Sequence, residues 1–333
     1  MAEKIGVIGA GAWGTALAML LADKGHDVTL WMYEKDLAEE TARTRENRTY
    51  LPGFALPAAI RITSSMETAA SGMSLVLSVV PSHTARAVAK QFSPFLSKDS
   101  VIVSASKGLE LDTLMPLSDV FRDVLPRQFH DRLCFLSGPS FAKEVARKMP
   151  TAVALAAYDA ALGKKAQAAF SNAYFRIYTN PDVIGVELAG SLKNVVAIAA
   201  GLLEGMGYGY NTMAALLTRG LAEMARLGVA MGGSLPTFSG LAGMGDLVLT
   251  CTGGLSRNRT IGVRLGKGET LDEIMKGART VAEGVKTAKA ARDLARKYKV
   301  DMPIVDEVCL ILHEGKDPRQ AVKDLMKREL REE

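Results

Sequence analysis

The chain has 333 residues, of which 48% are hydrophobic, 23% charged and 6% aromatic, and its formal net charge is +5. This length allows about two domains and a large core without disulfide or metal staples. The apolar fraction and the small net charge exclude a mainly disordered protein. The mild excess of basic residues fits anionic small ligands, and no basic cluster interleaved with aromatic residues indicates a nucleic-acid surface.

The first half of the chain alternates strand-like and helix-like segments, a pattern typical of a doubly wound α/β domain. The strand-like segments are 5–8, 28–31, 75–80, 101–103, 133–137, 151–156 and 176–178, and the segment 15–24 has helical periodicity. The runs at 75–80 and 101–103 are continuously apolar, as in strands that are covered on both faces of a parallel sheet. We therefore predict an N-terminal Rossmann domain with a mostly parallel sheet.

The character of the sequence changes at the turn signal Asn180-Pro181-Asp182. The helix-like segments beyond it are 183–203, 213–231, 271–275, 288–298, 304–313 and 318–328. Glycine-rich stretches at 201–209, 232–245 and 253–254 are interpreted as loops. We predict a Rossmann dinucleotide-binding domain at 1–180 and an all-α substrate-binding and catalytic domain at 181–333.

Neither a membrane span nor a secretory signal is predicted. The richest apolar run, 195–203, is far shorter than the ~20 residues of a span, and the first four residues lead directly into a strand. Cys134, Cys251 and Cys309 are odd in number and widely spaced, and the four histidines lack metal-ligand spacing. We expect no metal site, no disulfide framework and a cytoplasmic protein.

The segment 9–14, Gly-Ala-Gly-Ala-Trp-Gly, has the G-x-G-x-x-G pattern between a predicted strand and a predicted helix, as in dinucleotide-binding sites. Gly9 would permit the tight turn, Gly11 the approach of the pyrophosphate, and Gly14 close packing of helix on strand. The alternative is a glycine-rich turn that binds nothing. Glu34 ends the second strand, where an acid favours NAD because it accepts hydrogen bonds from ribose hydroxyls and repels a 2′-phosphate; otherwise Glu34 is a surface acid at a helix start.

Lys193 lies inside a long apolar helix and has small or apolar neighbours at helical spacing. Burial of its ammonium would lower its pKa toward neutrality and make it a candidate acid and base for alcohol–ketone interconversion. The alternative is a lysine whose ammonium reaches the surface. Asp246, after a glycine-rich run, could orient this lysine.

Two segments offer groups for an oxyanion. In 137–142 a strand ends and Ser140 is a plausible N-cap of a following helix. In 253–259 Arg257 stands beside a serine and an asparagine, as in a phosphate clamp, although a polar loop with a surface arginine is equally compatible. Lys107 follows the strand at 101–103 and adds a cation near the expected cofactor edge.

Long motifs occur in order along the chain: GAGAWGTALA at 9–18, NRTYLPG at 47–53, VPSH at 80–83, SKGLE at 106–110, LSGPSFAKEV at 136–145, ELAGSLKNVVAIAAGLLEG at 187–205, GLAGMGDLVLTCTGGLSRNR at 240–259 and VAEGVKTA at 281–288. In these motifs the chain resembles the NAD(P)-dependent glycerol-3-phosphate dehydrogenases of the bacterial type along essentially its whole length. That family combines a Rossmann domain with an all-helical C-terminal domain.

The resemblance implies roles for individual residues. Lys193 would be the catalytic lysine, supported by Asp246. Positions that would contact substrate or support the lysine are Lys107, Gly138, Ser140, Thr250, Ser256, Arg257 and Asn258. Besides Gly9, Gly11 and Gly14, positions that would contact the cofactor are Ala12, Trp13, Tyr33, Glu34, Lys107, Ala142, Arg257, Val281 and Glu283.

Two positions depart from the family pattern. Tyr33-Glu34 stands where many bacterial members carry His-Arg or Arg-Arg, and looks more like the NAD-using eukaryotic relatives. Ala12 stands where bacterial relatives often have serine. NAD(H) and NADP(H) are both implied as cofactors, and Glu34 favours NAD.

The resemblance implies hydride transfer between NAD(P)H and C2 of dihydroxyacetone phosphate, which gives sn-glycerol 3-phosphate for phospholipid synthesis. A lysine-using ketopantoate or β-hydroxyacid reductase is the enzymatic alternative, and it would need a carboxylate site in place of a phosphate clamp. A non-catalytic NAD-sensing protein is the alternative from another class. A homodimer is expected by analogy with other helical domains of this kind.

Overall fold

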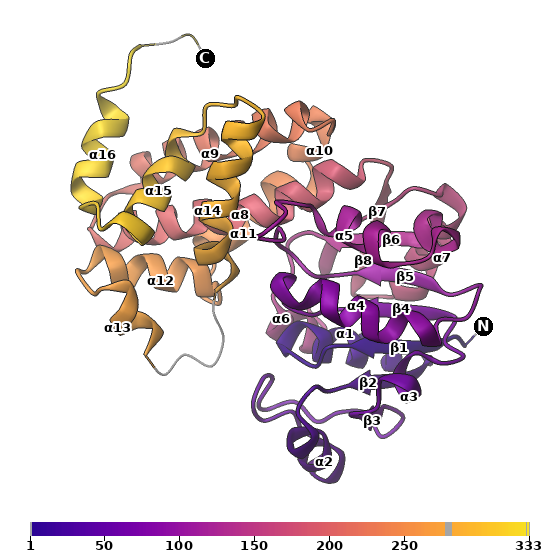
Figure 1. Cartoon of the computed structure of the whole chain (residues 1–333). Coiled ribbons are helices and arrows are strands. Elements are labelled where there is room, and N and C mark those ends of the chain that lie inside the picture. The colour runs from indigo at the N-terminus through magenta and orange to yellow at the C-terminus, as the bar shows by residue number, and fades with distance from the viewer. Residues whose placement is uncertain (1, 277–281, 331, 333) are drawn as a thin grey trace.

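One eight-stranded sheet forms the centre of the N-terminal part of the chain (Figure 1). The computed structural model describes residues 2–276, 282–330 and 332. The strands are β1 Lys4–Ile8, β2 Asp27–Trp31, β3 Arg61–Thr63, β4 Leu75–Ser78, β5 Val101–Ser104, β6 Leu133–Ser137, β7 Thr151–Ala157 and β8 Phe175–Asn180. Their order is β3-β2-β1-β4-β5-β6-β7-β8, and every neighbouring pair is parallel except β6 and β7. The predicted Rossmann-type, mostly parallel sheet is confirmed.

Helices cover both faces of this sheet because its central strands are apolar on both sides. β4 and β5 are buried at every position. Residues of α1 and α7 belong to the core on one face, whereas residues of α3, α4 and α5 belong to the core on the other. The helices of this part are α1 Ala12–Asp23, α2 Lys35–Thr44, α3 Met66–Ala70, α4 Ala85–Phe92, α5 Leu117–Val124, α6 Ala142–Ala146 and α7 Ala160–Phe170, with 3₁₀ turns η1 Ser82–Thr84, η2 Ser93–Phe95 and η3 Arg127–Arg132.

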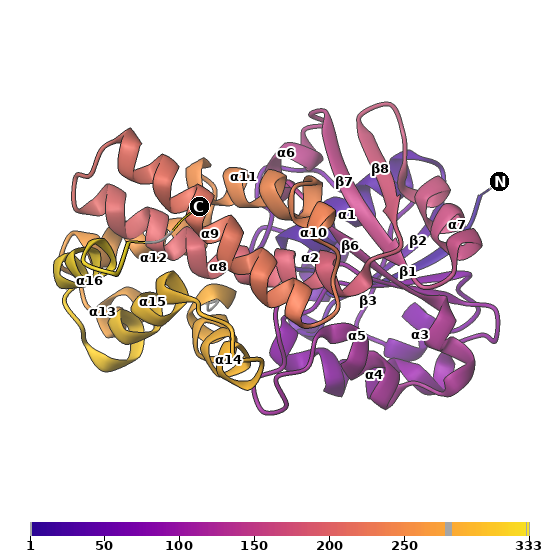
Figure 2. The ribbon, with the colours of Figure 1, turned by 90° about the horizontal axis from the view of Figure 1, so that it is seen from above.

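After β8 the described chain is helical. Asp182 begins this part as the N-cap of α8, and its carboxylate accepts a hydrogen bond of 2.8 Å from the Gly185 N–H. The elements are α8 Val183–Gly205, α9 Tyr210–Ala230, α10 Leu235–Phe238, η4 Leu241–Gly245, α11 Asp246–Thr252, α12 Arg257–Gly266, α13 Leu271–Met275, α14 Glu283–Lys297, α15 Pro303–Glu314 and α16 Pro318–Met326. α8 runs through the middle of this part and packs against α9, α11, α12 and α14 (Figure 2).

α8 is long and apolar enough to cross a membrane by length and composition, but 89% of its apolar window is buried inside the protein. The expectation that no segment reaches membrane length was therefore wrong. Single polar residues such as Lys193 interrupt the apolar runs along the sequence, yet the average hydropathy of the helix stays high.

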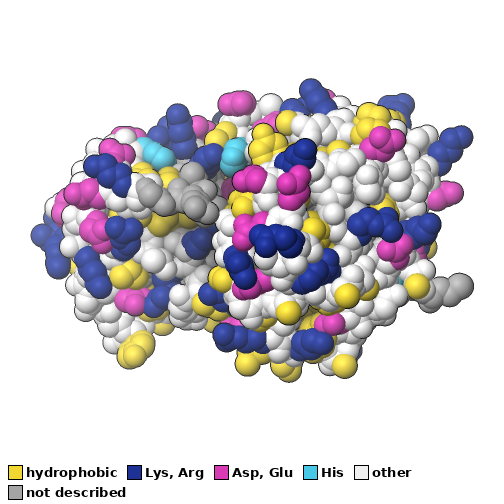
Figure 3. Space-filling model, turned by 90° about the horizontal axis from the view of Figure 1, so that it is seen from below, with side chains coloured by type: hydrophobic (Ala, Val, Ile, Leu, Met, Phe, Trp, Pro, Cys, Tyr) yellow, Lys and Arg dark blue, Asp and Glu magenta, His cyan; other side chains and the backbone are white. Residues whose placement is uncertain are grey.

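On the face shown in Figure 3, basic and acidic side chains are interspersed.

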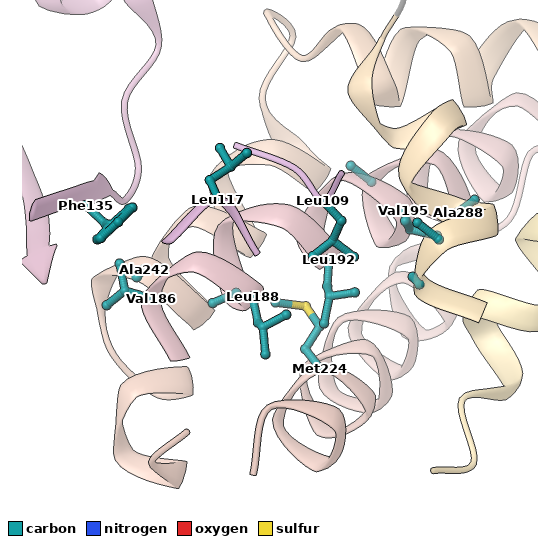
Figure 4. Close-up of a cluster of buried hydrophobic side chains, with 14 of the residues drawn as sticks. Leu109, Leu117, Phe135, Val186, Leu188, Leu192, Val195, Met224, Ala242 and Ala288 are labelled. Carbon is teal, nitrogen blue, oxygen red and sulfur yellow. The ribbon is translucent and has the colours of Figure 1, made fainter. Parts of the chain in front are cut away.

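The sheet and the helices share one hydrophobic core. The cluster of buried side chains in Figure 4 extends from Phe135 on β6 and Leu117 on α5 to Leu192 on α8, Met224 on α9 and Ala288 on α14. Because α8 contributes to this cluster along much of its length, the same helix that carries Lys193 also joins the two parts of the chain.

Two of the predicted loops are helical over part of their length. The glycine-rich residues 201–205 belong to α8, and residues 241–245 form the π-helix η4. The prediction failed in α8 because glycines allow α8 and α12 to pack closely. A Cβ on Gly201 of α8 would lie 2.0 Å from the Arg259 carbonyl oxygen of α12, and a Cβ on Gly262 of α12 would lie 2.1 Å from the Ile198 carbonyl oxygen of α8. The elements β3, α3, α4, α5, α7, α11 and α12 were not predicted individually from the sequence.

Gly201→Ala should lower the free energy of unfolding by about 1–3 kcal/mol or more, since the added methyl group forces two packed backbones apart. Gly254→Ala is the matched control, because a Cβ at Gly254 meets nothing within 4 Å. Urea denaturation of both variants measures the difference. Identical midpoints would contradict the close approach of α8 and α12.

Candidate active site

Lys193 is buried, and its ammonium meets a carboxylate from another helix. Its Nζ donates hydrogen bonds to Asp246 Oδ1 and, at 2.8 Å, to Thr250 Oγ1. Asp246 and Thr250 lie one turn apart on α11, and the Thr250 hydroxyl donates in turn to the Asp246 carbonyl oxygen at 2.6 Å. Helix α11 thus supplies the polar partners that Lys193 lacks on its own helix. The alternative that the Lys193 ammonium reaches the surface is excluded, because the residue is 6% exposed.

A second lysine reaches the same carboxylate from the Rossmann part. Lys107, after β5, donates to Asp246 Oδ2 at 2.7 Å and to the Gly138 carbonyl oxygen at 3.3 Å. Asp246 is 1% exposed and Lys193 6% exposed. The Lys107–Gly108 turn is held on α8, since the Gly108 N–H donates to Ser191 Oγ at 3.0 Å. The centre is therefore assembled from both parts of the chain.

Burial and charge act on these groups in opposite directions. Burial and the charge of Lys107 lower the pKa of Lys193 and the attraction of Asp246 raises it, with a net result of about 8. Burial alone would raise the pKa of Asp246, but the two ammonium groups outweigh it and hold that pKa below its usual value. A lysine whose pKa lies near neutrality, beside an ionised carboxylate, can give or take a proton at physiological pH.

The glycine-rich turn after β1 has the expected geometry. Gly9 has a φ of +113°, which favours glycine, and a Cβ on Gly14 would lie 1.9 Å from the Gly9 carbonyl oxygen. A Cβ on Gly11 would meet nothing within 4 Å, so this N-cap of α1 is open to an approaching ligand. Ala12 and Trp13 form the first turn of α1. This turn can hold a pyrophosphate at the helix N-terminus.

Glu34 follows β2 and forms the N-cap position of α2, without a capping hydrogen bond from its side chain. Its Oε1 instead accepts a hydrogen bond of 2.9 Å from the Tyr50 hydroxyl. Tyr33 is 77% exposed and its ring contacts the edge of Trp31. Since β2 ends at Trp31, Glu34 does not end the strand as predicted but lies in the turn after it, at the helix-start position given as the alternative, and its carboxylate has a tyrosine as partner.

Ser140 does not cap a helix. The N-cap of α6 is Phe141, and the Ser140 hydroxyl donates to the Gly138 carbonyl oxygen at 3.0 Å. Gly138 has a φ of +142° and bends the chain between β6 and α6, so the hydroxyl turns back to this bend instead of reaching the helix. Ala142 is the first residue of α6. Gly138 contacts the lysine centre, because its carbonyl oxygen accepts a hydrogen bond from Lys107.

The predicted phosphate clamp lies at the N-terminus of α12. Ser256 is its N-cap and accepts a hydrogen bond of 3.2 Å from the Arg259 N–H, and Arg257 is exposed at the first helical position. Asn258 is buried, and its amide is used in packing: it donates to Asn194 Oδ1 at 2.9 Å and accepts from the Gly284 N–H at 3.0 Å. Asn258 thus joins α8, α12 and α14.

Glu283, the first residue of α14, contacts the Rossmann part. Its carboxylate accepts hydrogen bonds from the Ser82 hydroxyl at 2.8 Å and from the Ser82 N–H at 3.3 Å. Val281, another expected cofactor contact, lies outside the described residues. Among the described residues, no group of three or more His, Cys, Asp and Glu could hold a metal ion.

Three polar residues around the centre were not predicted from the sequence: Ser82, Ser191 and Asn194. Ser191 and Asn194 are buried polar residues of the apolar α8, and that pattern could have indicated them. Ser82 lies within the VPSH motif, but its partner Glu283 is 201 residues further along the chain, so no local pattern reveals the contact.

The fold and the lysine–carboxylate centre together define the class: a Rossmann-type dehydrogenase with a helical second domain. Residues 4–163 match the family model of the N-terminus of NAD-dependent glycerol-3-phosphate dehydrogenase, and residues 182–323 match that of its C-terminus. The chain belongs to this family.

The relatives agree with this assignment. A protein from Geobacter sp. (strain M21) named glycerol-3-phosphate dehydrogenase [NAD(P)+] is 56% identical over 333 residues, which is 100% of this chain and 99% of that protein. The crystal structure of glycerol-3-phosphate dehydrogenase from Coxiella burnetii is 40% identical, with a TM-score of 0.93 over 98% of this chain and 99% of that one. A ketopantoate reductase from Ralstonia eutropha shares the fold at 17% identity, with a TM-score of 0.60 over 97% of this chain and 99% of that one.

Lys193 should titrate near pH 8 in the free protein, well below the usual 10.5, because burial disfavours its charged form. NMR of protein labelled with ¹³C in its lysine side chains measures the midpoint, and the spectrum of Lys193→Met assigns the signal by its loss. Lys107→Met should raise the midpoint, since it removes a neighbouring cation. A midpoint above pH 10 would contradict this account of the site.

Proposed function

We propose that the protein interconverts dihydroxyacetone phosphate and sn-glycerol 3-phosphate with NAD(P)H as the reductant, and so supplies glycerol 3-phosphate for phospholipid synthesis. The observation that carries this proposal is the buried Lys193, paired with Asp246 and lying beside Lys107, in a chain of the glycerol-3-phosphate dehydrogenase family. The names of the relatives support the same reaction.

Lys193 is the acid and base of the reaction. In reduction its ammonium donates a proton to the ketone oxygen, which becomes the C2 hydroxyl, and in oxidation the neutral amine takes that proton back. Bound NAD(P)H supplies the hydride for C2. Asp246 holds the Lys193 ammonium in place, and Lys107 adds a second positive charge that stabilises the oxygen as its negative charge develops.

The substrate phosphate binds at the N-terminus of α12, where Arg257 supplies a guanidinium and the first turn of the helix supplies backbone N–H groups. Asn258 positions this end of α12 through its bonds to Asn194 and Gly284. The close packing of α12 on α8 sets the separation between the phosphate end of the substrate and Lys193. Binding energy at the phosphate thereby orients C2 for reaction.

The cofactor pyrophosphate binds at the glycine-rich turn of Gly9, Gly11 and Gly14, beside Ala12 and Trp13. Its adenosine ribose lies at Tyr33 and Glu34, and its nicotinamide end lies toward Lys107, Ala142 and Glu283. The Glu34 carboxylate favours NADH over NADPH, because two charges about 4 Å apart at a surface repel by ~1–4 kcal/mol.

The protein acts in the cytoplasm as a homodimer. Its three cysteines are free and buried, as suits a reducing compartment. The exposed apolar side chains Met244, Val248 and Leu255 on and beside α11 support self-association of the helical part. Analytical ultracentrifugation tests the dimer, and a purely monomeric protein at micromolar concentration would contradict it.

A steady-state assay with dihydroxyacetone phosphate, run in parallel with NADH and NADPH, tests the reaction. Turnover should be seen with both cofactors, with NADH equal or better. Lys193→Met should lower kcat by ~10²–10⁴ with little change in cofactor affinity, because it removes the proton donor. Lys316→Met is the control, since Lys316 pairs with Glu307 and Asp324. Turnover of ketopantoate in place of dihydroxyacetone phosphate would indicate the other reductase class, and cofactor binding without any turnover would indicate a sensor.

Arg257→Ala should weaken transition-state binding of dihydroxyacetone phosphate by about 1.5–3 kcal/mol, the value of a hydrogen bond to a charged group. The loss should be small for unphosphorylated dihydroxyacetone, measured as kcat/KM for both substrates. Arg259→Ala is the matched control on the same helix, since Arg259 pairs with Glu204 at 2.5 Å. Equal losses on both substrates would place Arg257 outside the phosphate site.

A further inference from the structure

The loop 45–53 lies against the glycine-rich turn, and no role in the proposed reaction has been assigned to it. Asn47 is buried, and its Nδ2 donates hydrogen bonds of 2.8 Å to the Ala10 carbonyl oxygen and to Thr15 Oγ1. Thr15 Oγ1 also donates to the Ala10 carbonyl oxygen, at 3.2 Å. One amide thus fixes the loop on the turn that would receive the pyrophosphate.

The same asparagine places Tyr50. The Tyr50 N–H donates to Asn47 Oδ1 at 3.2 Å, and the Leu51 N–H donates to the Asn47 carbonyl oxygen at 2.8 Å. From this anchored turn the Tyr50 hydroxyl donates to Glu34 Oε1 at 2.9 Å. The loop therefore contacts both the glycine-rich turn and the acid at the start of α2.

Three cations of this region, Arg45, Arg48 and Lys35, have partners other than Glu34. Arg45 donates to the carbonyl oxygens of Pro57 and Ile60. Arg48 pairs with Glu46 at 3.3 Å, and Lys35 lies 3.9 Å from Glu39. The hydrogen bond that the structure gives to the Glu34 carboxylate comes instead from the Tyr50 hydroxyl.

We propose that Tyr50 is a specificity-determining residue that positions the Glu34 carboxylate and thereby selects NADH over NADPH. The proposal rests on the proposed function, in which Glu34 faces the adenosine ribose. The hydroxyl holds Oε1, which leaves Oε2 to accept hydrogen bonds from the ribose hydroxyls. A fixed carboxylate repels a 2′-phosphate more strongly than one that can rotate away, because Coulomb repulsion falls with distance.

The test is Tyr50→Phe, which removes the hydroxyl and keeps the ring. The ratio of kcat/KM for NADH to that for NADPH should fall about three- to tenfold, the range of one hydrogen bond. The change should appear in the KM values, and kcat at saturating NADH should stay within about twofold. Tyr174→Phe is the matched control, since its hydroxyl lies 3.4 Å from Asp23 at the far end of α1, and it should leave the ratio unchanged.

A double-mutant cycle separates positioning from direct contact. Glu34→Gln should lower the ratio by itself, and adding Tyr50→Phe to Glu34→Gln should change it little, because a residue that acts through Glu34 has no effect once the charge is gone. Full additivity of the two changes, an unchanged ratio in Tyr50→Phe, or a larger loss for NADPH than for NADH would each overturn the proposal.

The failures of the two proposals are distinguishable. If neither cofactor supports turnover of dihydroxyacetone phosphate, the proposed reaction fails, and titration of NADH and NADPH by protein fluorescence still measures the effect of Tyr50→Phe on selectivity. If turnover is normal but Glu34→Gln leaves the ratio unchanged, Glu34 does not face the ribose, and the proposal for Tyr50 is overturned while the reaction stands.

Discussion

The carboxylate of Asp246, buried between two ammonium groups, is the interaction on which the rest of the structure depends. A lysine inside an apolar helix is costly unless an anion meets it. Asp246 meets Lys193 from the helical part and Lys107 from the Rossmann part, so one carboxylate links the two. Two cations and one anion leave a formal charge of +1 at the centre, which suits an anionic ligand and an oxygen that becomes negative during reaction.

α8 makes this arrangement possible because it is buried on nearly all sides. Its apolar residues join the core of the sheet to that of the helices, and its glycines let α12 approach until the two backbones touch. A helix that is held so closely cannot move its polar side chains far. Lys193 and Asn194 are therefore fixed relative to the N-terminus of α12, where an anion would bind.

Polar contacts close to the centre fix how the two parts meet. Ser191 on α8 accepts from the Gly108 N–H and so holds the turn that carries Lys107, while Ser82 donates to Glu283 at the start of α14. Such bonds limit the freedom of the groups they connect, and a site that acts on a small substrate needs its groups placed within about 0.5 Å. The buried hydroxyls thus serve the chemistry as supports.

The sequence by itself determined the parallel sheet, the glycine-rich turn, the order of the two parts and the apolar helix around Lys193, because these follow from local periodicity, glycine spacing and apolar context. The choice between a buried and a surface-reaching Lys193 was decided by the tertiary structure, because α11 supplies its partners. The partners of Lys193, the packing role of Asn258, the bond of Tyr50 to Glu34 and the helical glycines near 201 were decided by the tertiary structure. Each depends on residues far apart in the chain, and a local pattern of side chains contains no information about which distant backbone or charge it will meet.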